Sequence, residues 1–149
     1  MLKETLRAVA DKCTKFAQGE LIEEGSVGQT IVSIDANGKT DAHLVGPDED
    51  VVELLKQAAK TSIGIIMIFD AYFATVPKDQ AGNLPENFKD LPGANSALMC
   101  VAYSKGVADV RRLAYSRNTT GGYTFIDLGW DDKEISTDCR FANPFNGGN

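Results

Sequence analysis

One carboxylate, Asp70, lies in the longest apolar run of the chain, residues 62–76. A carboxylate in apolar surroundings is costly unless it finds a partner. The nearest suitable charges are Arg111 and Arg112, on a segment predicted to join the same sheet. Because neighbours on a strand point to opposite faces, at most one of them meets Asp70 directly. Asp127, on the following segment, is a further member of this group.

This arrangement allows different interpretations of Asp70. It forms a structural pair with an arginine, closing an open face of the sheet at a dimer interface, or it is exposed. In the functional interpretation, Asp70 is the acid–base group of a pocket and one arginine holds an anionic ligand. The candidate ligand-binding residues are therefore Asp70, Tyr72, Arg111, Arg112 and Asp127.

Motifs for cofactor or metal chemistry are missing from the sequence. It has no phosphate-binding glycine loop, no Gly-x-Ser-x-Gly turn, and no Cys-x-x-Cys or His-x-x-x-His spacing. Its one histidine, His43, is expected to be structural. We therefore predict no catalytic residue, no metal ligand and no cofactor. Acid–base chemistry without a cofactor leaves no such motif, so the sequence leaves open whether the protein is an enzyme.

Composition limits the classes of partner and compartment. The 149 residues are 43% hydrophobic and 24% charged, with a net charge of -6, which suits one globular domain. An acidic chain repels bulk nucleic acid and anionic membranes. Three cysteines with no close pairing are a poor disulfide framework, so we expect a cytoplasmic protein.

One local region is basic. It contains Lys105, Arg111, Arg112 and Arg117, with two tyrosines nearby. Basic residues interleaved with aromatic ones can hold single-stranded nucleic acid. A role as a single-stranded nucleic-acid accessory protein is therefore the weaker alternative.

Apolar spacing and turn residues predict the elements that position these side chains. Strand 62–76 is apolar on both faces, and residues 77–95 form a long loop. The expected elements, in order, are a helix over 2–18 that ends at Gly19, a hairpin of 29–34 and 39–45, a helix over 47–60, strand 62–76, a hairpin of 96–104 and 107–117, strand 123–130, and a tail that frays over 143–149.

This order does not alternate strand with helix. We therefore predict a single α+β domain over residues 1–149, in two layers. Its sheet is largely antiparallel, with about six strands, and both helices pack on one face. The order is α-β-β-α-β-β-β-β. The pattern is typical of the small proteins that bacterial and phage genomes encode, and it assigns no function.

The second face of strand 62–76 carries Ile66, Ile68, Asp70 and Tyr72, and no predicted helix covers it. Apolar faces of this kind usually mark interfaces. The leading hypothesis is a non-catalytic binding or assembly domain that self-associates, as a dimer, through this face. The alternative is a small-molecule-binding protein or enzyme that uses Asp70 and one arginine under the 77–95 loop.

Overall fold

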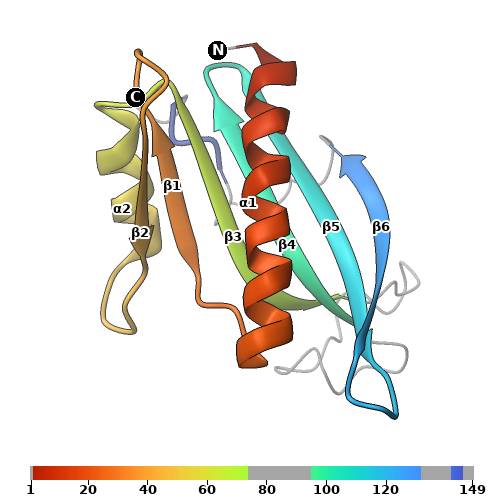
Figure 1. Cartoon of the computed structure of the whole chain (residues 1–149). Coiled ribbons are helices and arrows are strands. Elements are labelled where there is room, and N and C mark those ends of the chain that lie inside the picture. Colours follow the sequence, from red (N-terminus) through yellow and green to blue (C-terminus); the bar gives the residue numbers. More distant parts are fainter. Residues whose placement is uncertain (1, 74–94, 132–141, 146–149) are drawn as a thin grey trace, which may run out of the picture.

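Six antiparallel strands and two helices make up the computed structural model, which describes residues 2–73, 95–131 and 142–145 (Figure 1). The sheet order is β2-β1-β3-β4-β5-β6. The α+β class, the antiparallel sheet and the element order are as predicted. The elements are α1 (Lys3–Glu24), β1 (Thr30–Ile34), β2 (Thr40–Leu44), α2 (Val51–Ala59), β3 (Gly64–Phe73), β4 (Asn95–Ser104), β5 (Val107–Arg117) and β6 (Tyr123–Asp131).

Turn chemistry fixes the two hairpins. In the first, the Asp35 carboxylate accepts hydrogen bonds from the backbone N–H groups of Asn37 and Lys39, both at 2.9 Å. Gly38 has φ +81, which glycine adopts without strain. The second hairpin turns at Gly106, with φ +74, and pairs Cys100 with Arg111. That register, read from the sequence as a two-residue loop, is confirmed.

The two helices cover opposite faces of the sheet, so the prediction that both pack on one face is wrong. Ile66 and Ile68 of β3 are buried in the cluster that contains the apolar stripe of α1. Ile65 and Met67, which point the other way, are buried in the cluster that contains Leu55 of α2. Because β3 is apolar on both faces, each face needs its own cover.

The face left open in the sequence prediction is therefore closed by α1 where it carries Ile66 and Ile68. Figure 1 shows α1 in front of β3 and β4, with β2 and β6 at the two edges of the sheet. An apolar periodicity shows that a helix is amphipathic, but it does not show which sheet face the helix will cover.

Helix α1 runs one and a half turns beyond its predicted end at Gly19. It ends at Gly25, whose φ is +78 and whose N–H donates to the Leu21 carbonyl at 2.8 Å. Leu21 is buried and extends the apolar stripe. Burial of this side chain outweighs the helix-propensity cost of an internal glycine, about 1 kcal/mol.

Two polar side chains fix further segments. Asp50 caps α2 by accepting hydrogen bonds from the backbone N–H groups of Val52 and Glu53. The Asn143 side-chain amide donates to the carbonyls of Ser104 and Val107, at 2.8 and 2.9 Å.

Of the tail expected to fray, residues 146–149 lie outside the described part, as does the predicted loop up to residue 94. No helix in the described part is long and apolar enough to cross a membrane.

Candidate functional site

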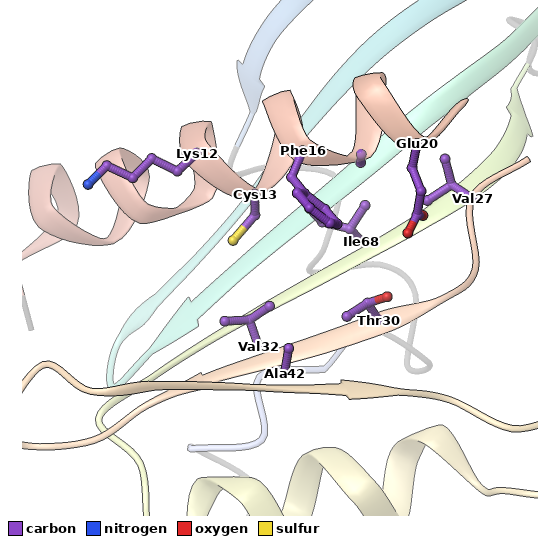
Figure 2. Close-up of a pocket in the computed structure, with 10 residues that line it drawn as sticks. Lys12, Cys13, Phe16, Glu20, Val27, Thr30, Val32, Ala42 and Ile68 are labelled. Atoms are coloured by element: carbon purple, nitrogen blue, oxygen red, sulfur yellow. The ribbon is translucent and has the colours of Figure 1, made fainter. Parts of the chain in front are cut away.

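A groove of about 280 Å³ lies between α1 and the β1–β2 hairpin, on the sheet face that α1 covers. Figure 2 shows Cys13 and Phe16 on α1, above Ile68, with Val32 and Ala42 on the hairpin side. The lining residues are Lys12, Cys13, Phe16, Ala17, Glu20, Val27, Thr30, Val32, Ala42 and Ile68.

Phe16 makes this groove unusual. This residue is 74% exposed and lies outside the buried stripe of α1. The buried stripe runs through Leu6, Ala10, Thr14, Ala17 and Leu21. Phe16 is two residues from Thr14, so it points to a different side of the helix. The sequence contains this signal, because Thr14 fits the i, i+3, i+4 spacing better than Phe16 does.

The groove wall also carries one charge of each sign. Lys12 and Glu20 lie one turn before and one turn after Phe16 on α1. The floor at Ile68 is buried, whereas the hairpin side at Ala42 is exposed. An apolar body therefore fits between the helix and the hairpin, with either charge available to a polar end.

Cys13 contributes a thiol to the groove wall. Desolvation by burial raises the pKa of Cys13, and a backbone hydrogen bond of that residue opposes the rise. Cys100 lies deeper, and burial raises the pKa of its thiol to about 12. Burial therefore disfavours the thiolate form of both side chains, which is the form that acts as a nucleophile. Cys139 lies outside the described residues.

Asp70 is exposed in the structure and accepts a hydrogen bond from the Tyr115 hydroxyl at 2.7 Å. The arginine contact considered from the sequence is replaced by this tyrosine. Asp70 is the seventh residue of β3 and lies beyond the part of the strand that packs beneath α1. The side chain of the neighbouring candidate, Tyr72, lies outside the described residues.

Arg111 is instead held between two other carboxylates. Its Nη2 lies 2.7 Å from Asp127 Oδ2, and its Nη1 donates to Asp11 of α1. The Asp127 hydrogen bond raises the pKa of Arg111, and the same bond lowers the pKa of Asp127. The structure thus brings together two of the predicted site residues, Arg111 and Asp127, in an ion pair that ties α1 to β5 and β6.

Arg112 is directed to the opposite side of the sheet from this ion pair. Its register partner in β4 is Met99, which packs against the cluster under α2. The predicted set of five therefore separates: Asp70 contacts Tyr115, Arg111 contacts Asp127, and Arg112 belongs to the other face.

A buried carboxylate that the sequence prediction overlooked is Asp109. Its side chain is 1% exposed, and Arg7 Nε lies 3.1 Å from its Oδ2. Lys3 Nζ lies 3.5 Å from its Oδ1. Both cations belong to α1, far from Asp109 in the sequence. Only the three-dimensional arrangement reveals that their ends reach β5.

Aromatic side chains gather where β5 meets β6. The ring centroids of Tyr115 and Tyr123 are 6.0 Å apart, and those of Tyr123 and Phe125 are 6.2 Å apart. The Arg117 guanidinium lies 5.9 Å from the Tyr123 ring centroid. Arg117 and Tyr115, two members of the basic region noted in the sequence, belong to this cluster, whereas Arg111 is paired with two carboxylates.

Within residues 2–73, 95–131 and 142–145, no group of three or more His, Cys, Asp and Glu side chains is placed to hold a metal ion. Comparison of the chain with protein-family models, with curated proteins and with solved structures gives no match.

Proposed function

We propose that this protein is a cytoplasmic, non-catalytic binding domain that self-associates and holds an apolar or amphipathic molecule in the groove between α1 and the β1–β2 hairpin. The observation that carries the proposal is the exposed Phe16 beside an open, apolar groove. A large aromatic side chain in water is costly, and binding that removes it from water is favourable.

The size and chemistry of the groove define the ligand class. Its volume of about 280 Å³ is near the lower end for ligand pockets, which hold roughly 300–1,000 Å³. Lys12 and Glu20 can each meet a charged end of the ligand, whereas the remaining walls are mostly apolar. Free Cys13 and Cys100 thiols agree with a reducing compartment.

The Asp70-centred alternative has less support. An anion clamp needs arginine donors directed at a ligand, and those of Arg111 are directed at Asp11 and Asp127. The Asp70 carboxylate remains accessible, so its chemistry stays a prediction. A nucleic-acid role has the weakest support, because the net charge is -6.

Binding of 1-anilinonaphthalene-8-sulfonate, an apolar fluorophore with one negative charge, tests the groove. We expect enhanced fluorescence from the native protein, lost or much reduced when Val32→Trp fills the groove and weakened by Phe16→Ala. The control is Ile22→Ala, which removes a 58% exposed apolar side chain from the same helix outside the groove.

A second readout locates the dye. In a Cys100→Ser, Cys139→Ser background, bound dye should slow the reaction of Cys13 with a thiol reagent, because Cys13 lines the groove. Equal fluorescence in all variants, with no protection of Cys13, would show that the dye binds elsewhere and would reject the groove.

A further inference from the structure

Strand β2 is an edge of the sheet formed by the described residues. All five of its residues are exposed, and within the described part of the chain the strand pairs on one side only, with β1. The Val45 N–H donates to the Gln29 carbonyl at 2.8 Å, in line with the β1–β2 register. Antiparallel partners alternate between bonded and non-bonded pairs. The backbone groups of Thr40, Ala42 and Leu44 therefore point away from β1, toward the open edge.

We propose that the occupant of this edge is a second copy of the same chain, with β2 pairing antiparallel to the second copy's β2 around a two-fold axis at Ala42. This inference rests on the self-association proposed above, and it names the surface. A two-fold interface requires that residue i of one copy meets residue j of the other, and the reverse.

The sequence of β2 meets that requirement. With Ala42 opposite the second copy's Ala42, small side chains lie at the axis, where bulky ones would collide. Thr40 then opposes the second copy's Leu44, so that a methyl group faces an apolar side chain that is 67% exposed in one copy. The outward backbone groups of these three residues exchange hydrogen bonds in both directions.

The other face of β2 carries polar side chains that also match in this register. Asp41 opposes the second copy's His43 in a non-bonded pair, where side chains lie closest. His43 Nε2 already contacts the Glu49 carboxylate at 3.0 Å, so its Nδ1 donates to the second copy's Asp41 only in the doubly protonated form of the ring. The contact occurs twice, once on each side of the axis. Pairing Asp41 with the second copy's Asp41, or His43 with its His43, would require a two-fold axis at a different residue.

The same pairing joins the two candidate grooves. Ala42 lines the groove of its own chain and lies at the proposed axis. The hairpin walls of the two grooves therefore meet along the paired β2 strands, and both grooves lie on the same face of the joined sheet. The two grooves together give the dimer a longer apolar binding surface than one chain has.

Disulfide trapping tests the register. Across the axis, Ala42 and its counterpart have Cα atoms about 5.5 Å apart, within the disulfide range of about 4.4–6.8 Å. In a background with Cys13, Cys100 and Cys139 changed to serine, Ala42→Cys should form covalent dimers under mild oxidation. Thr40→Cys is the matched control: its two copies lie roughly 14 Å apart along the strands, so it should remain monomeric on a denaturing gel.

Sedimentation velocity with Ala42→Pro tests whether the edge is required. Proline removes the outward N–H of Ala42 and leaves the β1–β2 bonds, a substitution that edge strands tolerate. We expect a wild-type dimer at high protein concentration and a monomer for Ala42→Pro with unchanged circular dichroism. Should the proline variant misfold, Ala42→Lys, which places like charges at the axis, should give the same monomer, whereas Ala8→Lys on exposed α1 should not.

Other results would overturn the inference in distinct ways. A wild-type monomer without Ala42→Cys trapping would remove the dimer, and dye binding by that monomer would leave the groove intact. A dimer that survives both Ala42→Pro and Ala42→Lys would place the interface elsewhere. Efficient trapping of Thr40→Cys would reject the register centred on Ala42.

Discussion

Arg7 Nε donates a hydrogen bond to Asp109 Oδ2 at 3.1 Å, joining the first helix to a strand 102 residues later in the chain. Asp109 is fully buried, whereas the Arg7 side chain is about one-third exposed. The Arg7 guanidinium also lies 5.1 Å from the Trp130 ring centroid, and Lys3 lies near the second carboxylate oxygen. One buried carboxylate of β5 thus anchors the N-terminal half of α1 to the sheet.

Replacing that carboxylate should destabilise the fold. We expect Asp109→Ala to lower the free energy of unfolding by about 2–4 kcal/mol, because it removes the buried partner of two cations. Urea denaturation measures the loss. Exposed Asp48→Ala is the control and should change stability by less than about 0.5 kcal/mol. Equal stability of the two variants would show that the network contributes nothing.

The Arg111–Asp127 pair should make stability depend on acidity. Arg111 holds the pKa of Asp127 below its ordinary value of 3.8, so the unfolded chain binds this proton more readily than the folded chain. The stabilisation is present above that ordinary value and disappears as pH falls through the lowered folded pKa.

Asp127→Asn measures this contribution. Because Asp127 is 46% exposed, its loss at pH 7 should be at most about 1 kcal/mol. The difference from wild type should be full at pH 7 and smaller at pH 3, below the ordinary pKa of the carboxyl group. A gap that is equally wide at both pH values would mean that the carboxylate acts by packing and not by charge.

Two glycines of α1 should respond to substitution in opposite directions. A Cβ added at Gly19 meets nothing within 4 Å, and this residue is internal to the helix. Gly19→Ala should therefore raise stability by about 0.5–1 kcal/mol. Gly25 has φ +78 at the helix end, so Gly25→Ala should lower stability by about 1 kcal/mol. Thermal unfolding of both variants measures these changes. A destabilised Gly19→Ala variant would show that a side chain at this position is not tolerated.

Asp70→Ala should have a small effect. The carboxylate is exposed and its hydrogen bond is with Tyr115, so no buried arginine is stranded when it is removed. We expect a loss below about 1 kcal/mol in chemical denaturation. A loss of several kcal/mol would mean that Asp70 belongs to a buried network after all.

The elements could be predicted from the sequence because local chemistry determines them. Asn37–Gly38 and Lys105–Gly106 lie at the turns of the two predicted hairpins. The two-residue loop of the second hairpin sets the pairing of Cys100 with Arg111. Strand β3 was recognised by its apolar run. Whether Asp70 in that run is buried stayed open, because the local pattern contains no information on which part of the sheet α1 covers.

The tertiary partners could not be predicted in this way. The face that each helix covers depends on packing between distant segments, and so does the pairing of Arg111 with Asp11 and Asp127 rather than with Asp70. The groove has the same origin. Phe16 becomes a groove wall only because the hairpin side at Val32 and Ala42 lies across from it.

The long separation between α1 and its contacts has a consequence for synthesis. At about 5–20 residues per second, a ribosome needs on the order of 5–20 s to proceed from Arg7 to Asp109. During that time, α1 has emerged, but β4 and β5, on which it packs, are still being made. Strand β3 also packs under α1 and is made earlier, so the nascent chain completes this core when the second hairpin arrives.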